Sequence, residues 1–328
     1  MANIPEIPPG TPTQSCPDWM SQLPEQLWDK PLYHLAIPGS HDAMSYCLDM
    51  CSPVQESEPL TIKALDYIMP CFTRPCLYKW GTAQAHSIAE QLDSGMRYFD
   101  FRITHKKHDT SDNLYFAHGV YTLMTVQEAL KDIAQWLTCH PKEIVILACS
   151  HFEGLSNELH ENLVFFMKQL FGDKICPYME LQETLTLRSF WRLGYQVIIS
   201  YDDSALIKRH KELWPVIPYW WANQVDPQDV LQYLEQQKQK GRPGGFFVAG
   251  LNLTENTQYV ILHPRASLKT MTQHSYSSFL EWIGKQSPGP GKACLNIICE
   301  DFVGINNFAS DVIHLNQKLL EPDIVTLS

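Results

Sequence analysis

Two histidines stand where short apolar runs end, in positions that suit proton exchange with a substrate. His41 follows the apolar residues 35–37 and a Pro-Gly turn, with Asp42 directly after it, and His118 ends the run 116–117. A histidine at the end of a strand is held by the sheet while its ring reaches into the loop layer. Taken alone, His41 is more simply explained as a polar residue that closes a strand.

A second group of polar residues strengthens the catalytic interpretation. Asp100 and Arg102 lie two apart in the expected strand 98–103, so both side chains leave the same face of that strand. Two imidazoles, a guanidinium and carboxylates at successive strand ends suit phosphoryl transfer. One imidazole can deprotonate a hydroxyl nucleophile, the other can protonate the leaving alkoxide, and the guanidinium can bind the phosphate oxygens. This chemistry needs no metal ion.

The overall charge of the chain limits the partners it can bind. The 328 residues include 25 basic and 36 acidic ones, for a formal net charge of −11. An acidic protein repels nucleic acid and anionic lipid headgroups, so we expect no nucleic-acid partner and no broadly basic membrane-docking face. Contact with a membrane surface is therefore expected to be peripheral, and either apolar or confined to a local patch.

Cysteine usage and the N-terminus predict a cytoplasmic protein. The ten cysteines have no tight repeated spacing, and Cys149 and Cys299 lie in apolar runs, which favours reduced core thiols. Residues 1–17 lack the basic start and apolar stretch of a secretory signal, and no segment has the length of a transmembrane helix. We expect a proline-rich N-terminal segment over residues 1–28, one catalytic domain over 29–328, and transient membrane association.

Strand and helix signals alternate along the chain and predict an α/β fold. The expected strands cover residues 33–37, 98–103, 114–117, 144–148, 196–200, 216–220, 246–251 and 295–302. Capping boxes begin helices at Ser87 and Thr125, Asp226-Pro227 begins another, and Gly95 and Gly241 stand where helices should end. Eight apolar strands with helices between them predict a TIM-like (β/α) barrel in a single domain. An open doubly wound sheet is the alternative, but no glycine-rich nucleotide fingerprint follows any strand.

Two further segments have open interpretations. Residues 47–84 form the longest expected irregular stretch, directly after His41, and its aromatic and aliphatic side chains can either touch lipid or pack on the barrel rim. The apolar cluster 214–221 can supply an aromatic ring, such as that of Trp221, to stack on the ring of a ligand, or it can pack in the core.

The order of these motifs resembles the X region of phosphatidylinositol-specific phospholipases C, and in particular its stand-alone X domain-containing group. The matching segments are residues 37–42 (IPGSHD), 95–102 (GMRYFDFR), 118–119 (HG), 141–147 (PKEIVIL) and the late strand 297–302 (IICEDF). The resemblance implies a phospholipase C that cleaves phosphoinositides to diacylglycerol and a cyclic or open inositol phosphate.

The same resemblance implies a role for each site residue. His41 would be the general base and His118 the general acid. Asp301 would orient the base and Asp42 would assist the acid, while Arg102 would stabilise the charged phosphate. Asp100, Tyr201, Asp202 and Trp221 would contact the substrate. Tyr201 departs from the basic residue that related bacterial enzymes place there, which bears on headgroup affinity.

Metal dependence is predicted from the same positions. The calcium-using branch of the family has an asparagine after the first histidine, an acidic pair in the second motif and a further glutamate after the fourth strand. This chain has Asp42, then Asp100 with Arg102, and then Cys149-Ser150-His151. A guanidinium cannot coordinate a cation and supplies its own positive charge, so we expect neither a metal nor another cofactor, as in the bacterial branch.

Two other functions compete with this interpretation. A glycerophosphodiester phosphodiesterase on a similar barrel would require a cluster of metal-binding carboxylates, for which the sequence offers no candidate. A non-catalytic inositol-lipid-binding or scaffolding protein with the same barrel is the main alternative. The preferred headgroup and the oligomeric state do not follow from the sequence.

Overall fold

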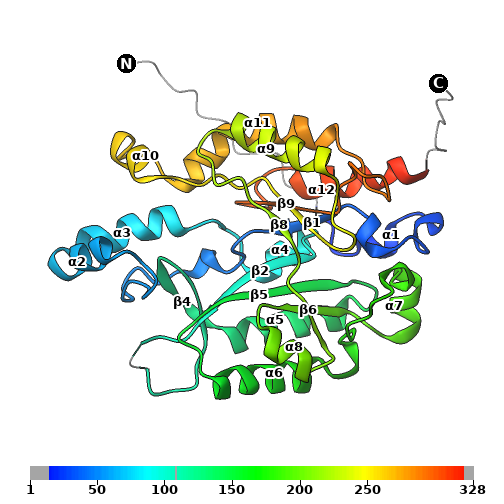
Figure 1. Ribbon diagram of the computed structural model, residues 1–328, viewed down its shortest axis with the longest axis horizontal. Helices are drawn as coiled ribbons and strands as arrows, with labels where there is room; N and C mark the ends of the chain where they lie inside the picture. Colours follow the sequence, from blue (N-terminus) through cyan, green and yellow to red (C-terminus); the bar gives the residue numbers. More distant parts are fainter. Residues whose placement is uncertain (1–14, 108, 321–328) are drawn as a thin grey trace.

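The computed structural model describes residues 15–107 and 109–320, and its centre is a curled parallel sheet (Figure 1). The neighbouring strands in the main path of the sheet run in the order β7-β6-β5-β2-β1-β10-β9-β8, and every pair is parallel. Their bounds are β1 Ile37–Ser40, β2 Tyr98–Thr104, β5 Val145–Glu153, β6 Val197–Tyr201, β7 Leu213–Trp214, β8 Tyr219–Trp220, β9 Val248–Gly250 and β10 Ile297–Glu300. The expected TIM-like α/β architecture is confirmed.

Alternation of side chains along the strands creates two cores, one inside the barrel and one between the sheet and the helices. Ile37, Tyr98, Ile198 and Ile297, from four different strands, meet in the inner cluster. Residues at the intervening positions, such as Phe99 on β2, pack in the outer cluster against the helices. Side chains from widely separated strands can share one inner cluster only if the sheet curls upon itself. The predicted core thiols are also confirmed, because Cys149 and Cys299 are buried and form no disulfide.

The barrel is incomplete on one side. The sheet ends at β7 and at β8, and in the described part of the chain no ladder of hydrogen bonds joins these two strands. The strand expected over 216–220 is confirmed only at Tyr219–Trp220, which form β8. Pro215 and Pro218 lie between β7 and β8, and a proline lacks the N–H that a ladder needs.

The expected strand over 114–117 is not part of the barrel wall. Strand β3 (Tyr115–His118) pairs antiparallel with the end of β2 and with β4 (Val120–Thr125). Gly119 makes the tight turn between β3 and β4 with a φ of +76°, a conformation that glycine adopts at little cost. His118 is thus carried by a hairpin at the rim of the barrel and not by a parallel strand.

The first strand begins later than expected. Residues Leu32–His34 form a 3-10 turn, and Pro38-Gly39, expected as a turn, lies inside β1. A Cβ atom on Gly39 would lie 2.4 Å from the Cys299 sulfur, so glycine at this position permits the close approach of β10. This approach brings the ends of β1 and β10 together.

Helices cover the outside of the sheet, and their predicted starts are confirmed. Ser87 and Thr125 form capping boxes, Asp226 caps the helix that begins at Pro227, and Gly241 follows its last residue. The helices are α1 Trp19–Gln22, α4 Ile88–Asp93, α5 Val126–Cys139, α6 Asn157–Phe171, α7 Leu187–Leu193, α8 Ser204–Arg209, α9 Pro227–Lys240, α10 Thr257–Leu262, α11 Leu268–Gly284 and α12 Phe308–His314. Among the helices of residues 15–107 and 109–320, none combines the length and the apolar character that crossing a bilayer requires.

The segment over residues 47–84 was expected to be irregular, but it contains two helices. Helices α2 (Leu60–Ile68) and α3 (Pro70–Gly81) project from one end of the barrel (Figure 1). Pro59 and Pro70 stand at the starts of these helices, where a missing N–H costs nothing. Pro75 lies in the interior of α3, and Pro53 lies before α2 outside any helix. Pro59 and Pro70 therefore mark helix starts rather than a loop.

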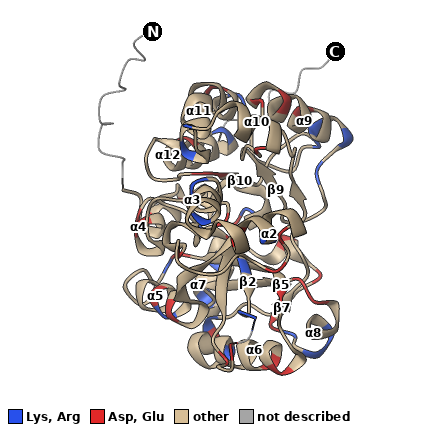
Figure 2. Cartoon of the chain, turned by 90° about the vertical axis from the view of Figure 1, so that its left-hand side faces the viewer, with Lys and Arg blue, Asp and Glu red and all other residues tan. Residues whose placement is uncertain are grey.

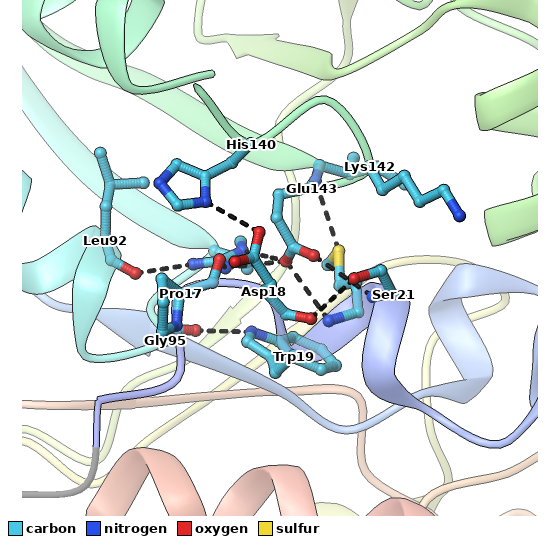
Figure 3. A network of polar contacts seen from close by, with 12 residues as sticks. Pro17, Asp18, Trp19, Ser21, Leu92, Gly95, His140, Lys142 and Glu143 are labelled. Carbon is cyan, nitrogen blue, oxygen red and sulfur yellow. Dashed lines mark hydrogen bonds and ion pairs between the residues drawn. The ribbon is translucent and has the colours of Figure 1, made fainter. Parts of the chain in front are cut away.

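Residues 15–28 pack against the opposite end of the barrel. The buried Arg97 guanidinium lies 2.7 Å from a Glu143 carboxylate oxygen and donates to the carbonyl of Pro17, while Trp19 donates to the carbonyl of Gly95 (Figure 3). Trp19 and Leu27 are part of the inner core. This part of the N-terminal segment is therefore continuous with the barrel, and residues 1–14 lie outside the described residues.

Candidate active site

The general-base candidate lies where β1 and β10 end side by side. These strands pair with Ser40 opposite Glu300, so the next residues along the two chains, His41 and Asp301, are neighbours. His41 Nδ1 lies 2.7 Å from Asp301 Oδ1. Asp301 is fully buried, and burial of a carboxylate is costly unless it is hydrogen-bonded. The two residues therefore form an oriented histidine–carboxylate pair.

Arg102 lies on the other side of the same imidazole. Its Nη2 is 2.7 Å from His41 Nε2, and its Nε is 3.4 Å from Asp100 Oδ2. A guanidinium has only donors, so His41 Nε2 accepts this hydrogen bond and Nδ1 carries the proton that is donated to Asp301. Burial lowers the pKa of Arg102, but Asp100 and Asp42 outweigh burial and hold the pKa above its ordinary value. Arg102 is a permanent cation beside a base whose Nε2 lone pair faces it.

The general-acid candidate has a carboxylate of its own. His118 Nδ1 lies 2.7 Å from Asp42 Oδ2 and 2.8 Å from the carbonyl oxygen of Gly81. Burial lowers the pKa of His118 and Asp42 raises it, with a net increase. Burial raises the pKa of Asp42, but the charges of His118 and Arg102 prevail and set it at about 2. The Asp42 carboxylate therefore favours the protonated, charged form of His118.

Three residues around these groups have positive φ angles although they are not glycine. Asp42 has a φ of +42°, Phe302 of +53° and His151 of +54°. Asp42 and Phe302 directly follow His41 and Asp301, and His151 follows the inner part of β5. Strained backbone of this kind is concentrated at functional sites, where the surrounding structure enforces it.

A cavity of about 320 Å³ opens beside the base and the arginine. This volume is within the range of small-ligand sites. Of the residues expected to contact substrate, Asp100, Asp202 and Trp221 line it, together with His41 and Arg102. Asp42, Asp301 and His118 do not line it. The two carboxylates contact the imidazoles, and His118, whose side chain is 31% exposed, lies at the rim beside Asp42.

The expected contact of Tyr201 with the substrate is wrong, because its side chain lies on the face of β6 that points away from the cavity. Its hydroxyl is 2.7 Å from His160 Nδ1, and its ring stacks on Phe152 in the outer core. Side chains alternate along a strand, so Ser200 faces the cavity and Tyr201 cannot. The alternation of residues 197–201 contained this signal.

Further cavity residues had no assigned role in the sequence analysis. They are Tyr98, Ala148, Cys149, Ser150, His151, Ser200, Val216, Ile217, Tyr219 and Asn252. Tyr219 donates to the Asn252 side-chain oxygen over 2.9 Å, which fixes a polar pair at the wall. The place of Tyr98 and Ala148 in the cavity wall was predictable from the alternation of a strand. Tyr98 lies two residues before Asp100 on β2, and Ala148 lies two residues before Ser150 on β5.

Comparison with known proteins places this site in a family. Residues 66–202 match the family model "Phosphatidylinositol-specific phospholipase C, X domain". The human PI-PLC X domain-containing protein 1 is 52% identical over 303 residues, which cover 92% of this chain and 93% of the relative. The chain belongs to the PI-PLC X domain-containing family. The human family member PI-PLC X domain-containing protein 3 is 36% identical over 303 residues, 91% of this chain and 93% of the relative.

Solved structures share the fold of this family member at low identity. The phosphatidylinositol-specific phospholipase C of Listeria monocytogenes has a TM-score of 0.62 and 20% identity, covering 92% of this chain and 99% of the other. The S. aureus phosphatidylinositol-specific phospholipase C has a TM-score of 0.60 and 16% identity, covering 93% and 98%. The X domain chain therefore has the barrel of these bacterial proteins.

Proposed function

We propose that this chain is a phospholipase C that cleaves phosphoinositides by histidine base and acid catalysis without a metal ion. The observation that carries the proposal is a pair of imidazoles, each with its own carboxylate, of which His41 faces the cavity beside the Arg102 guanidinium and His118 lies at its rim. A scaffold that only binds lipid has no use for an oriented Nε2 lone pair on His41 together with a second imidazole whose pKa is raised by its own carboxylate.

The proposed reaction uses these groups in order. His41 Nε2 takes the proton of the inositol 2-hydroxyl, and this oxygen attacks the adjacent phosphorus. The bond from phosphorus to the diacylglycerol oxygen breaks, and His118 donates its proton to the leaving oxygen. Arg102 exchanges its contact with His41 for the phosphate oxygens and stabilises the charge that grows in the transition state. Diacylglycerol and a cyclic inositol phosphate leave, and water can open the cyclic product.

The headgroup would occupy the cavity beside Arg102. Asp100, Asp202 and the pair of Tyr219 with Asn252 offer hydrogen-bond partners for ring hydroxyls, and Trp221 offers an aromatic face. Positive charge for the phosphate comes from Arg102. The contacts with Asp100 and His41 hold this guanidinium beside the base. Its positive charge can take the place of the calcium ion that other branches of the wider family use, which supports a metal-free mechanism.

A membrane surface would contact α2, α3 and α10 as the chain collects its substrate. α2 has no buried residue, and Leu60, Tyr67, Ile68, Phe72, Ile261 and Leu262 are each at least 65% exposed. Lys79 on α3 donates to the carbonyl of Pro264, just after α10, so these helices are adjacent. Figure 2 faces this side and shows charges of both signs scattered over the elements instead of one basic patch. Apolar contact from the cytoplasmic side, rather than charge attraction, would hold the protein transiently at the lipid.

Cleavage of phosphatidylinositol in micelles with excess chelator tests the proposal. Release of diacylglycerol by the wild type and its loss in His41→Ala would support it. Binding of the lipid without cleavage would instead favour the non-catalytic lipid-binding alternative. For the membrane surface, Phe72→Ser should weaken binding to phosphatidylinositol vesicles, while Phe165→Ser, which changes an exposed residue of α6, should not.

A further inference from the structure

The four residues that join α3 to the following loop contact both imidazole-bearing segments. Gly81, the last residue of α3, accepts a hydrogen bond from His118 Nδ1 through its carbonyl oxygen over 2.8 Å. Three residues later, Gln84 binds the backbone of His41. One short segment therefore touches the acid and the base, although it contributes no group to the chemistry proposed above.

Gln84 joins the two strand ends that carry His41 and Asp301. Its Nε2 donates to the carbonyl of His41 over 2.8 Å and to the carbonyl of Glu300 over 3.2 Å. Its Oε1 accepts from the N–H of Val303 over 3.0 Å. The side chain is fully buried, so water cannot replace these bonds. One amide thus fixes the backbone at the base and on both sides of its orienting carboxylate.

Gly81 sets the position of the acid by close approach. A Cβ atom at this residue would lie 2.4 Å from the backbone oxygen of His118. No side chain therefore fits between α3 and the rim hairpin. The Gly81 carbonyl and Asp42 Oδ2 both face His118 Nδ1, which holds the Nδ1 proton and leaves Nε2–H as the proton to be donated.

The residue beside Gln84 completes the connection. The N–H of Phe302 donates to the carbonyl of Ala83 over 2.7 Å, and the N–H of Ala83 donates to Ser45 Oγ over 3.0 Å. The Ser45 hydroxyl in turn donates to the carbonyl of Asp42. The segment is therefore bonded to the residues that directly follow His41 and Asp301 in the chain.

We infer that residues 81–84 form a positioning segment that sets the geometry of both catalytic imidazoles, with Gln84 acting through His41 and Gly81 through His118. The catalytic part of this inference rests on the proposed function. Because the segment continues α3 directly, a displacement of the apolar α2–α3 pair at a membrane surface would reach both imidazoles.

The decisive comparison is Gln84→Ala with Gln196→Ala. Gln196 is also a buried glutamine, and its Nε2 binds the backbone carbonyls of Leu137, His140 and Glu143 at the opposite end of the barrel. Both changes remove a buried amide with three backbone bonds. Misplacement of a catalytic group costs up to about 100-fold in rate. Gln84→Ala should therefore lower kcat about 10- to 100-fold on phosphatidylinositol with KM nearly unchanged, and Gln196→Ala should leave kcat unchanged.

A second readout does not depend on turnover. The proton on His41 Nδ1 that is donated to Asp301 should give a low-field NMR signal, identified by its loss in His41→Ala. This signal should shift or broaden in Gln84→Ala and stay in place in Gln196→Ala. If the wild type shows the signal but cleaves no lipid, the proposed function fails while the positioning of His41 is still tested.

Two further variants guard against misfolding. Gln84→Met keeps the length and approximate volume of the side chain and loses both donors, so it should reproduce the kcat and NMR effects if the alanine variant does not fold. Gly81→Ala should lower kcat through His118 and leave the His41 signal in place. Equal loss of kcat in the Gln84 and Gln196 variants, or an unmoved His41 signal in a folded Gln84 variant, would overturn the inference.

Discussion

Arg102 Nη2 lies 2.7 Å from His41 Nε2, so a group that can only donate occupies the position from which the base would take its proton. The contact keeps the Nε2 lone pair free of a proton and directs Nδ1–H to Asp301. An incoming phosphate competes for the same guanidinium. Binding of the substrate would therefore release the base at the moment at which it is needed.

Arg102→Lys should lower turnover by about a hundredfold, which corresponds to about 3 kcal/mol. A lysine is a point charge on a flexible stem and cannot bind Asp100, His41 and a phosphate through a planar fork. Turnover and melting temperature measured on the same preparation test this. A variant with wild-type turnover, or a wild type that requires calcium, would contradict the metal-free role of this arginine.

His41→Ala and His118→Ala should each lower kcat by about 10² to 10⁴. Neither imidazole belongs to the two apolar cores, so both variants should keep the far-UV circular dichroism spectrum of the wild type. His314→Ala, at the exposed end of α12, is the matched control and should retain full activity. Full activity of a folded His118 variant would remove the assignment of the acid.

Asp301→Asn should reduce kcat and preserve lipid binding. An asparagine can present its NH₂ group to His41 Nδ1 and so favour the wrong tautomer, as the loss of an orienting carboxylate does in other histidine-based sites. Vesicle co-sedimentation and initial rates separate the two effects. A loss of binding with unchanged kcat would show that Asp301 is not an orienting residue.

Asp42→Asn should shift the alkaline limb of the pH–rate profile to lower pH. The Asp42 carboxylate raises the pKa of His118, so its removal lets the acid lose its proton at lower pH.

The ion pair of Asp42 with His118 also stabilises the fold within a defined pH window. The contribution of His118 to the stability of the fold is complete below about pH 6.5 and is lost as the pH rises above it. The contribution of Asp42 is complete above about pH 4 and is lost as the pH falls toward 2. Urea unfolding of both proteins should differ most between these limits.

Glu300→Gln should stabilise the protein at alkaline pH. Burial raises the pKa of Glu300 to about 8, and Asp301 acts in the same direction. The folded chain therefore binds this proton more tightly than the unfolded chain, and stability falls as pH rises from about 4.5 to 8. A neutral amide avoids that loss, so Tm should exceed that of the wild type more at pH 8.5 than at pH 5.

Glu143→Gln is the matched contrast for this prediction. Glu143 is also buried, but it faces the buried Arg97 guanidinium. Neutralising it leaves that cation without its partner, which costs about 3–5 kcal/mol. Its Tm should fall at both pH values. A stabilised Glu143 variant, or a destabilised Glu300 variant at pH 8.5, would contradict the account of these two carboxyl groups.

The sequence by itself determined the features that depend on neighbours along the chain. Helix starts at Ser87, Thr125 and Asp226 are set by side chains within three residues of the cap, and the common face of Asp100 and Arg102 follows from the alternation of a strand. The motif order led to the family, and through it to the roles that we propose for His41, His118 and Asp301. Such signals need no knowledge of the distant chain.

Only the tertiary structure decided the relationships between segments that are far apart. The contact of His41 with Asp301 joins residues 260 positions apart and requires β1 to pair with β10. The place of the hairpin that carries His118 at the barrel rim depends on the pairing of β3 with the end of β2. Local propensity is silent about these pairings, because the free energy that selects them comes from burying both faces of the sheet at once.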